Sequence, residues 1–149
     1  MSDYDLESRI GPAVEEVLET MFFSSVSEAD ESDLNAPVLT VRVPFEGEVS
    51  GVVEIRISQG CARTLAASFL GDEEESLSRV QIEQMACELA NMICGAVVSK
   101  PESGEGLRLG SPELLSSADD NVALASFVQR DFSVENGTLS VLLFTGVQA

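Results

Sequence analysis

The sequence contains no histidine, and its 8 basic residues are far outnumbered by 26 acidic ones. Without histidine, Ser-His-Asp and Cys-His catalysis are excluded, as is any metal site built on imidazole ligands. The net charge of −18 would repel nucleic acid phosphates and anionic lipid, so neither nucleic acid nor a membrane surface is expected as a partner. A partner with a basic surface would be attracted, although the charge could also serve only to maintain solubility.

Cysteine is scarce, and the three thiols, Cys61, Cys87 and Cys94, form no CxxC pair. On one helix, Cys87 and Cys94 would lie roughly 10 Å apart along the axis, which is too far for a disulfide. The sequence near them offers no base or cation that would activate a thiol. We therefore interpret all three as buried free thiols in a reducing compartment.

The chain also lacks a long apolar run, because the longest, Leu89–Val98, is about half the length that a membrane-spanning helix needs. The acidic N-terminus, with Asp3, Asp5 and Glu7, lacks the basic region of a signal peptide. A length of 149 residues and a hydrophobic share of 44% are typical of one globular domain. We expect a single domain over residues 1–149 in a soluble, cytoplasmic protein.

Apolar residues at helical spacing predict a first helix over Leu6–Phe23. Gly11-Pro12 marks either the start of its regular part or a kink. A second helix is expected to begin after a capping Ser58 and to end at Gly71. Its predicted inner stripe consists of Cys61, Leu65 and Phe69.

A third helix is expected from about Ser78 to Lys100, after the acidic cluster Asp72–Glu75. Ser78-x-x-Gln81 matches a capping box at its start, and Pro101 stops it.

Alternating apolar and polar residues predict the strands. Val38–Val43 and Val49–Ile57 are expected to form a hairpin around Glu46-Gly47-Glu48, with Glu54 on the face opposite the apolar one. The preceding segment Ser24–Pro37 is rich in Ser, Asp and Glu, and is expected to be an exposed loop. Three more strands are predicted after the loop Glu102–Gly106, the last two joined by a turn at Glu135-Asn136-Gly137; they are Leu107–Leu109, Val122–Phe132 and Thr138–Phe144.

The predicted order of elements is therefore α-β-β-α-α-β-β-β. Such an order, with strands joined by short turns, is typical of an α+β fold. We expect an antiparallel sheet with the helices packed on one face.

Helix geometry assigns two faces to the third helix. The predicted buried stripe falls within an arc of roughly 80° and consists of Ile82, Met85, Leu89, Ile93 and Ala96. The opposite side carries Gln84, Glu88, Asn91 and Gly95. A glycine there, which costs a helix about 0.5–1 kcal/mol relative to alanine, would let another molecule come close. Alternatively the polar side chains are only solvated, and Gly95 lets a neighbouring element pack.

At this helix the sequence resembles a known family. Cys87-Glu88-Leu89-Ala90-Asn91-Met92-Ile93-Cys94-Gly95 is similar to the Glu-x-x-Asn-Met-Ile-x-Gly segment of CheX-like chemotaxis phosphatases, which are related to CheC and FliY. Weaker similarities extend over most of the chain, at Thr20-Met21-Phe22, Gly51-Val52-Val53-Glu54-Ile55, Phe69-Leu70-Gly71 and Leu109-Gly110-Ser111-Pro112.

The resemblance implies hydrolysis of the aspartyl phosphate on a CheY-like response-regulator receiver domain. Asn91 would orient the attacking water, and Glu88 would contact the receiver's active-site lysine, with Gln84 and Gly95 on the partner-binding surface. The chain would need no metal or cofactor of its own, because the Mg²⁺ of such a reaction belongs to the receiver. A homodimer formed by pairing of sheet edges is also implied, for which Val122–Val128 could supply the edge.

Two further interpretations stay open. The CheC-type motif begins with Asp or Ser four residues before the glutamate, where this chain has Gln84. The protein could therefore be a non-catalytic module that docks on a receiver or on a flagellar switch component. Separately, it could be a structural subunit whose acidic surface only keeps it soluble. The first helix offers no second motif, since Glu15 is followed three residues later by Leu18 and Glu16 by Glu19. We expect one site per chain, as in CheX.

Overall fold

Three helices and one antiparallel sheet make up the fold in the computed structural model, which describes residues 3–22, 24–29, 38–46, 50–98, 108–115, 126–134 and 137–145. The elements in chain order are α1 (Asp3–Met21), β1 (Val26–Ala29), β2 (Val38–Glu46), β3 (Gly51–Ser58), α2 (Gln59–Leu70), the 3₁₀ turn η1 (Glu74–Ser76), α3 (Arg79–Val98), β4 (Arg108–Leu109), β5 (Glu113–Leu115), β6 (Ser126–Val134) and β7 (Gly137–Thr145). None of the helices in these ranges is long and apolar enough to cross a bilayer.

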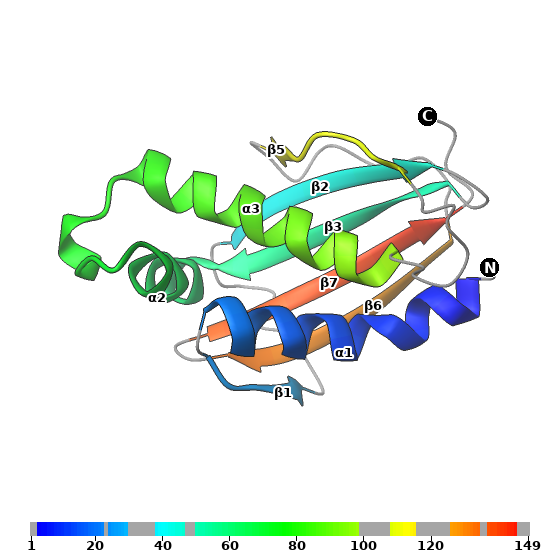
Figure 1. Ribbon diagram of the computed structural model, residues 1–149, viewed down its shortest axis with the longest axis horizontal. Helices are drawn as coiled ribbons and strands as arrows, with labels where there is room; N and C mark the ends of the chain where they lie inside the picture. Colours follow the sequence, from blue (N-terminus) through cyan, green and yellow to red (C-terminus); the bar gives the residue numbers. More distant parts are fainter. Residues whose placement is uncertain are drawn as a thin grey trace.

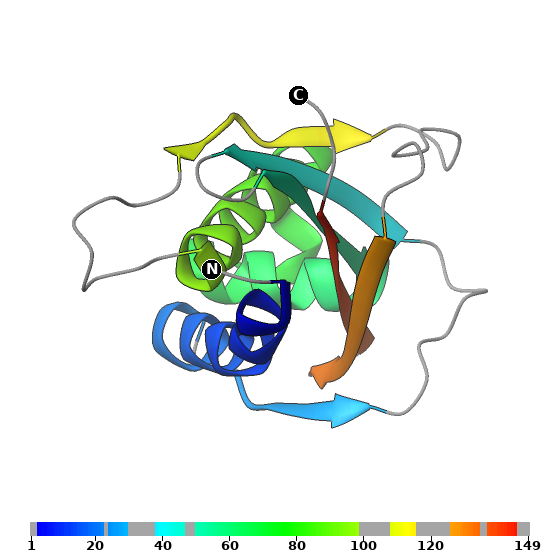
Figure 2. The same cartoon turned by 90° about the vertical axis from the view of Figure 1, so that its right-hand side faces the viewer.

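The sheet runs in the order β1-β6-β7-β3-β2-β4, and β5 pairs with the other end of β2. The helices lie on one side of it (Figures 1 and 2). The predicted α+β class, the antiparallel sheet and the order of the main elements are therefore confirmed.

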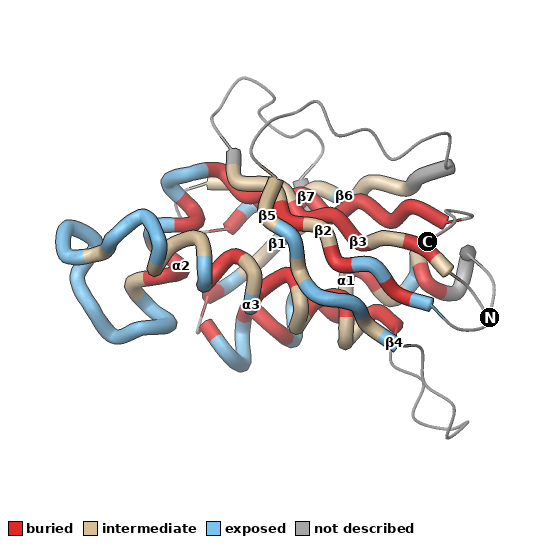
Figure 3. Tube along the Cα trace, turned by 90° about the horizontal axis from the view of Figure 1, so that it is seen from above, coloured by how far each residue is buried: buried red, intermediate tan, exposed pale blue. Residues whose placement is uncertain are grey.

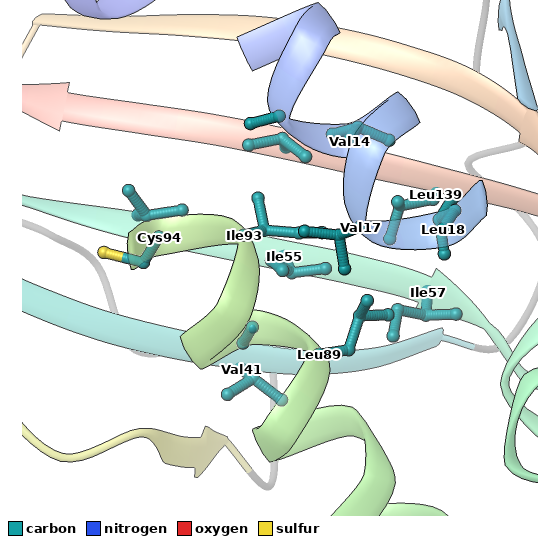
Figure 4. Close-up of a cluster of buried hydrophobic side chains, with 14 of the residues drawn as sticks. Val14, Val17, Leu18, Val41, Ile55, Ile57, Leu89, Ile93, Cys94 and Leu139 are labelled. Atoms are coloured by element: carbon teal, nitrogen blue, oxygen red, sulfur yellow. The ribbon is translucent and has the colours of Figure 1, made fainter. Parts of the chain in front are cut away.

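The core lies between this sheet and α1 and α3. Figure 4 shows Val14 and Val17 of α1 and Leu89 and Ile93 of α3 above Ile55 of β3, and all of them are buried. The centre of the stripe predicted for α3 is confirmed, since Met85, Leu89 and Ile93 are buried, whereas Ile82 and Ala96 at its margins are half-buried.

α1 begins at Asp3 and contains Pro12, so the alternative in which the helix starts at Gly11-Pro12 is wrong. Proline removes one intrahelical hydrogen bond and disfavours the preceding turn. Here Leu6 and Ile10 are fully buried on that turn, and packing of an apolar face contributes more to a helix than local propensity does.

The other two helices differ in how their N-termini are capped. At α3 the capping box is confirmed, because Ser78 Oγ accepts from the Gln81 N–H at 3.1 Å and Gln81 Oε1 accepts from the Ser78 N–H at 2.8 Å. At α2, Ser58 occupies the predicted cap position but makes no side-chain cap bond. Its hydroxyl instead accepts from the Thr138 N–H of β7 at 3.1 Å.

The C-terminus of α2 is as predicted, with Gly71 in the left-handed conformation at φ 71°. Of its predicted inner stripe, Cys61 and Leu65 are buried. Phe69 is 37% exposed and stacks on Phe22, with ring centroids 5.0 Å apart. The prediction that Phe69 points inward was wrong, because its ring extends beyond the core to Phe22 at the end of α1.

Part of the loop predicted over Ser24–Pro37 is a strand. Val26–Ala29 forms β1 and pairs with β6 from Val134 to Asp131. A strand of four residues depends on such a long-range partner rather than on its own sequence. The pairing also covers one end of β6, the strand expected to supply a dimer edge. On the same side, Ser126–Arg130 pairs with no other strand among the described residues.

β2 runs on to Glu46, and β5 is a further short strand that the sequence did not predict. β6 and β7 form the predicted hairpin, with Val134 opposite Gly137. The predictions for residues 23, 30–37, 47–49, 99–107, 116–125 and 135–136 lie outside the described residues.

The face of the sheet opposite the helices carries an ion-pair cluster around a buried carboxylate. Glu54 of β3 points to this face, as predicted, but its side chain is only 1% exposed. Arg42 Nε donates to one carboxylate oxygen at 2.6 Å and Arg56 Nε to the other at 2.5 Å. The two arginines therefore satisfy both oxygens of a carboxylate that would otherwise be very costly to bury.

Candidate functional site

α3 presents the two candidate catalytic side chains on the side away from the core. Glu88 is exposed and Asn91 is half-buried, while Leu89 and Ala90 between them are fully buried. Asn91 follows Glu88 by three positions, so their side chains are neighbours on successive turns. The structure therefore places the carboxylate and the carboxamide together, as the helical arithmetic predicted.

The other two predicted site residues flank this pair along the helix. Gln84 is exposed one turn before Glu88, and Gly95 is half-buried one turn after Asn91. A Cβ atom added at Gly95 would lie 3.7 Å from the side chain of Leu109 in β4, which is an ordinary van der Waals contact. Gly95 thus borders a neighbouring strand, as one of the two interpretations anticipated, and its role in partner binding stays a prediction.

A cavity of about 600 Å³ lies next to Glu88, between α2 and α3. We call it the α2–α3 groove. Its lining includes Phe69 and Leu70 of α2 together with Val80, Gln84, Cys87 and Glu88 of α3. Leu70 and Val80 were not predicted as site residues, because helical periodicity describes one helix at a time and the groove is formed by two.

Acidic groups dominate the surroundings of the groove. Glu83 and Glu88 belong to its lining, and Asp72–Glu75, all exposed, lie in the segment that joins its two helices. Arg79 donates to Glu83 at 3.0 Å but is itself largely exposed, so this pair only partly offsets the local charge. The site therefore favours a cationic partner group.

The pKa of the Cys87 thiol is affected by these acidic groups. Burial raises the pKa of Cys87, and the neighbouring carboxylates of Glu83 and Glu88 raise it further. Burial alone raises the pKa of Cys61 and of Cys94 to about 12. All three cysteines are free thiols, but Cys87 is only half-buried, so the expectation of three buried thiols holds for Cys61 and Cys94 alone.

These pKa shifts predict the order in which the thiols react. With a thiol-specific reagent at pH 8, the native protein should be labelled first at Cys87, more slowly than an ordinary exposed cysteine, because the reactive species is the thiolate. Glu88→Gln removes one negative charge, lowers the pKa of Cys87 and should speed its labelling severalfold. Peptide mapping of the labelled protein measures this. Equal labelling of Cys87 in both proteins would contradict the assigned influence of Glu88.

The chemistry available to the pair follows from its functional groups. A carboxamide donates and accepts hydrogen bonds at once, so Asn91 can hold a water molecule in a fixed orientation. A carboxylate binds an ammonium group by charge-assisted hydrogen bonds, so Glu88 can hold a lysine. The pair suits positioning rather than nucleophilic or strong general-base catalysis, and positioning is most effective where the substrate is already reactive.

Comparison with solved structures shows what the fold resembles. The chemotaxis protein CheX from Vibrio vulnificus superposes with a TM-score of 0.77 at 18% identity, over 94% of this chain and 95% of that one. A CheC-like superfamily protein from Shewanella sp. PV-4 gives 0.77 at 17% identity, over 97% and 99%. The CheX-CheY-BeF3-Mg²⁺ complex from Borrelia burgdorferi gives 0.69 at 14% identity, over 94% and 97%. The chain has the fold of CheX and CheC-like proteins.

A match at the level of sequence identifies the family of this chain. Residues 39–132, which run from β2 into β6, match the family described as chemotaxis phosphatase CheX. No curated protein matches the chain significantly. The chain belongs to the CheX family.

Proposed function

We propose that this protein dephosphorylates the aspartyl phosphate of a CheY-like receiver domain, with Asn91 orienting the attacking water and Glu88 binding the receiver's active-site lysine. The observation that carries the proposal is the display of a carboxylate and a carboxamide on successive turns of α3, on the side that the core leaves open. The solved CheX from Borrelia burgdorferi was crystallised with CheY, BeF3 and Mg²⁺, which supports a receiver as the partner.

The proposed reaction mainly requires the enzyme to position a water molecule. Water attacks phosphorus in line, the bond between phosphorus and the aspartate oxygen breaks, and inorganic phosphate leaves as the receiver's carboxylate is regenerated. An acyl phosphate is already activated, so orienting the water and stabilising charge can supply the acceleration. The Mg²⁺ that stabilises the phosphoryl group would be held by the receiver. Asn91 is suited to this role because it can bond both the water and the phosphoryl oxygens.

The test is the lifetime of receiver phosphate, measured with each CheY-like receiver from the same genome. Addition of the wild-type protein should shorten the lifetime for at least one of them, in proportion to the amount added and with multiple turnovers. If the lifetime of every receiver is unchanged, the protein is not a phosphatase of these domains.

Glu88→Ala should act on recognition more than on the chemical step. Loss of a charge-assisted contact with lysine should raise the receiver concentration for half-maximal rate by about 10-fold. The maximal rate should change much less, because Asn91 remains in place. Steady-state kinetics with varied phosphorylated receiver separate the two effects. A loss confined to the maximal rate would assign Glu88 to the chemistry instead.

The second candidate is a binding module that docks on a receiver or a flagellar switch component without hydrolysis. Gln84 favours it, because this exposed position departs from the Asp or Ser of the CheC-type motif. Stable binding with an unchanged phosphate lifetime is the expected result in that case. Gln84→Asp then provides a direct check, since a gain of activity would show that the departure limits catalysis.

A further inference from the structure

We infer that the α2–α3 groove is a specificity pocket for the receiver, which accepts an apolar side chain flanked by lysine or arginine. The inference rests on the proposed function, because it names what selects the partner beside Glu88 and Asn91. It concerns residues outside the Glu-x-x-Asn motif, principally Leu70 and Val80.

The exposed apolar residues of the described chain point to this groove. Among the described residues, four large apolar side chains are exposed, namely Met21 at 44%, Phe69 at 37%, Leu70 at 41% and Val80 at 58%. The last three line the groove. Scattered exposed apolar side chains are ordinary on a protein surface, whereas a concave cluster of them is typical of an interaction site. Two elements converge to form it, so the cluster does not arise from one helix stripe.

The position of the groove in the molecule leaves it accessible. α2, η1 and the first turns of α3 project beyond the end of the sheet (Figure 1), and the trace through this corner is largely exposed (Figure 3). Figure 1 also shows α3 leading from this corner across the sheet. A partner that reached Glu88 would therefore meet the groove at the same time, because Glu88 belongs to the lining of the groove and to the catalytic pair.

Charge complementarity identifies the class of occupant. The lining of the groove combines exposed apolar side chains with Glu83 and Glu88, and the linking segment adds Asp72, Glu73, Glu74 and Glu75. An acidic or neutral surface would be repelled or would leave these carboxylates desolvated without partners. An apolar anchor with basic neighbours satisfies both parts of the site, and anchors of this kind carry most of the energy of an interface.

The experiment measures binding of the receiver domain loaded with Mg²⁺ and beryllium fluoride, which stands in for the phosphoryl group. Wild type, Leu70→Ser, Val80→Ser and Met21→Ser are compared by titration calorimetry. Leu70→Ser and Val80→Ser should each weaken binding by about 5- to 10-fold. Met21→Ser is the matched control, because Met21 is exposed to a similar degree and does not line the groove.

The acidic part of the inference has its own readout. Glu73→Gln with Glu75→Gln removes two charges from the linking segment and should slow association severalfold at low salt, with little effect at 0.5 M salt. Dissociation should be nearly unchanged. Stopped-flow measurements of both rates provide the comparison.

The outcomes separate this inference from the proposed function. If Leu70→Ser and Val80→Ser stay folded by circular dichroism and bind as tightly as wild type, the groove is not the docking pocket, even when phosphate release is accelerated. If both substitutions weaken binding while wild type leaves the phosphate lifetime unchanged, the groove is the docking pocket and the proposed phosphatase activity is wrong. If wild type binds no receiver of its genome, the inference is overturned.

Discussion

Asn91→Ala should reduce the acceleration of receiver dephosphorylation by about 100-fold or more, while the protein still binds the receiver. Losing a single group that stabilises a transition state typically costs 10²- to 10³-fold in rate. The change should act on the maximal rate, because a water that is held only in the transition state contributes nothing to ground-state binding. Single-turnover measurement of phosphate release at saturating protein isolates that step.

Gln84→Ala is the matched control for this variant. Gln84 is also a carboxamide on α3, exposed two turns before Asn91. It should leave the maximal rate within about 3-fold of wild type, because it lies away from the proposed water. Equal losses in the two variants would mean that the outer face of α3 acts through docking alone, and the role of Asn91 in orienting water would have to be abandoned.

Glu54→Gln should lower the free energy of unfolding by about 3 kcal/mol, the largest effect that we expect from a residue outside the core. The substitution preserves size but leaves Arg42 and Arg56 facing each other across a neutral amide. Arg42 is 17% exposed at its side chain, so water compensates its charge poorly. Chemical denaturation monitored by circular dichroism measures the loss.

Glu83→Gln provides the comparison for stability. It breaks the Arg79–Glu83 pair of α3, in which Arg79 is 88% exposed. Exposed pairs four residues apart on a helix contribute about 0.3–0.5 kcal/mol. The contrast between the two variants tests burial as the cause, since each loses one carboxylate charge. A loss below 1 kcal/mol for Glu54→Gln would show that the cluster on the sheet is effectively solvated.

Features with local causes were predictable from the sequence. The capping box at Ser78 and Gln81 depends on groups three residues apart, and the left-handed Gly71 on the absence of a side chain. The outward position of Glu88 follows from helical periodicity. Each of these depends on a few neighbouring residues, so no knowledge of the rest of the fold was needed.

Features with long-range causes were not predictable. The hydroxyl of Ser58 bonds Thr138, 80 residues away, instead of its own helix, and β1 is a strand because β6 lies beside it. The burial of Glu54 depends on strand register, which places Arg42 opposite it on β2 and Leu142 on β7. The α2–α3 groove similarly requires knowing how two helices meet. Periodicity correctly gave the face of Glu54, but only the register shows that this face is buried there.

The site is part of a helix whose other side is the centre of the core, and this limits how it can respond to a partner. Leu89, Ala90 and Ile93, which lie next to Glu88 and Asn91 in α3, are fully buried. The backbone that carries both polar side chains is therefore fixed before any partner binds. Little conformational entropy is then left to lose on this side when the complex forms. Any rearrangement needed for a close fit would therefore occur in exposed side chains around the site and in the partner.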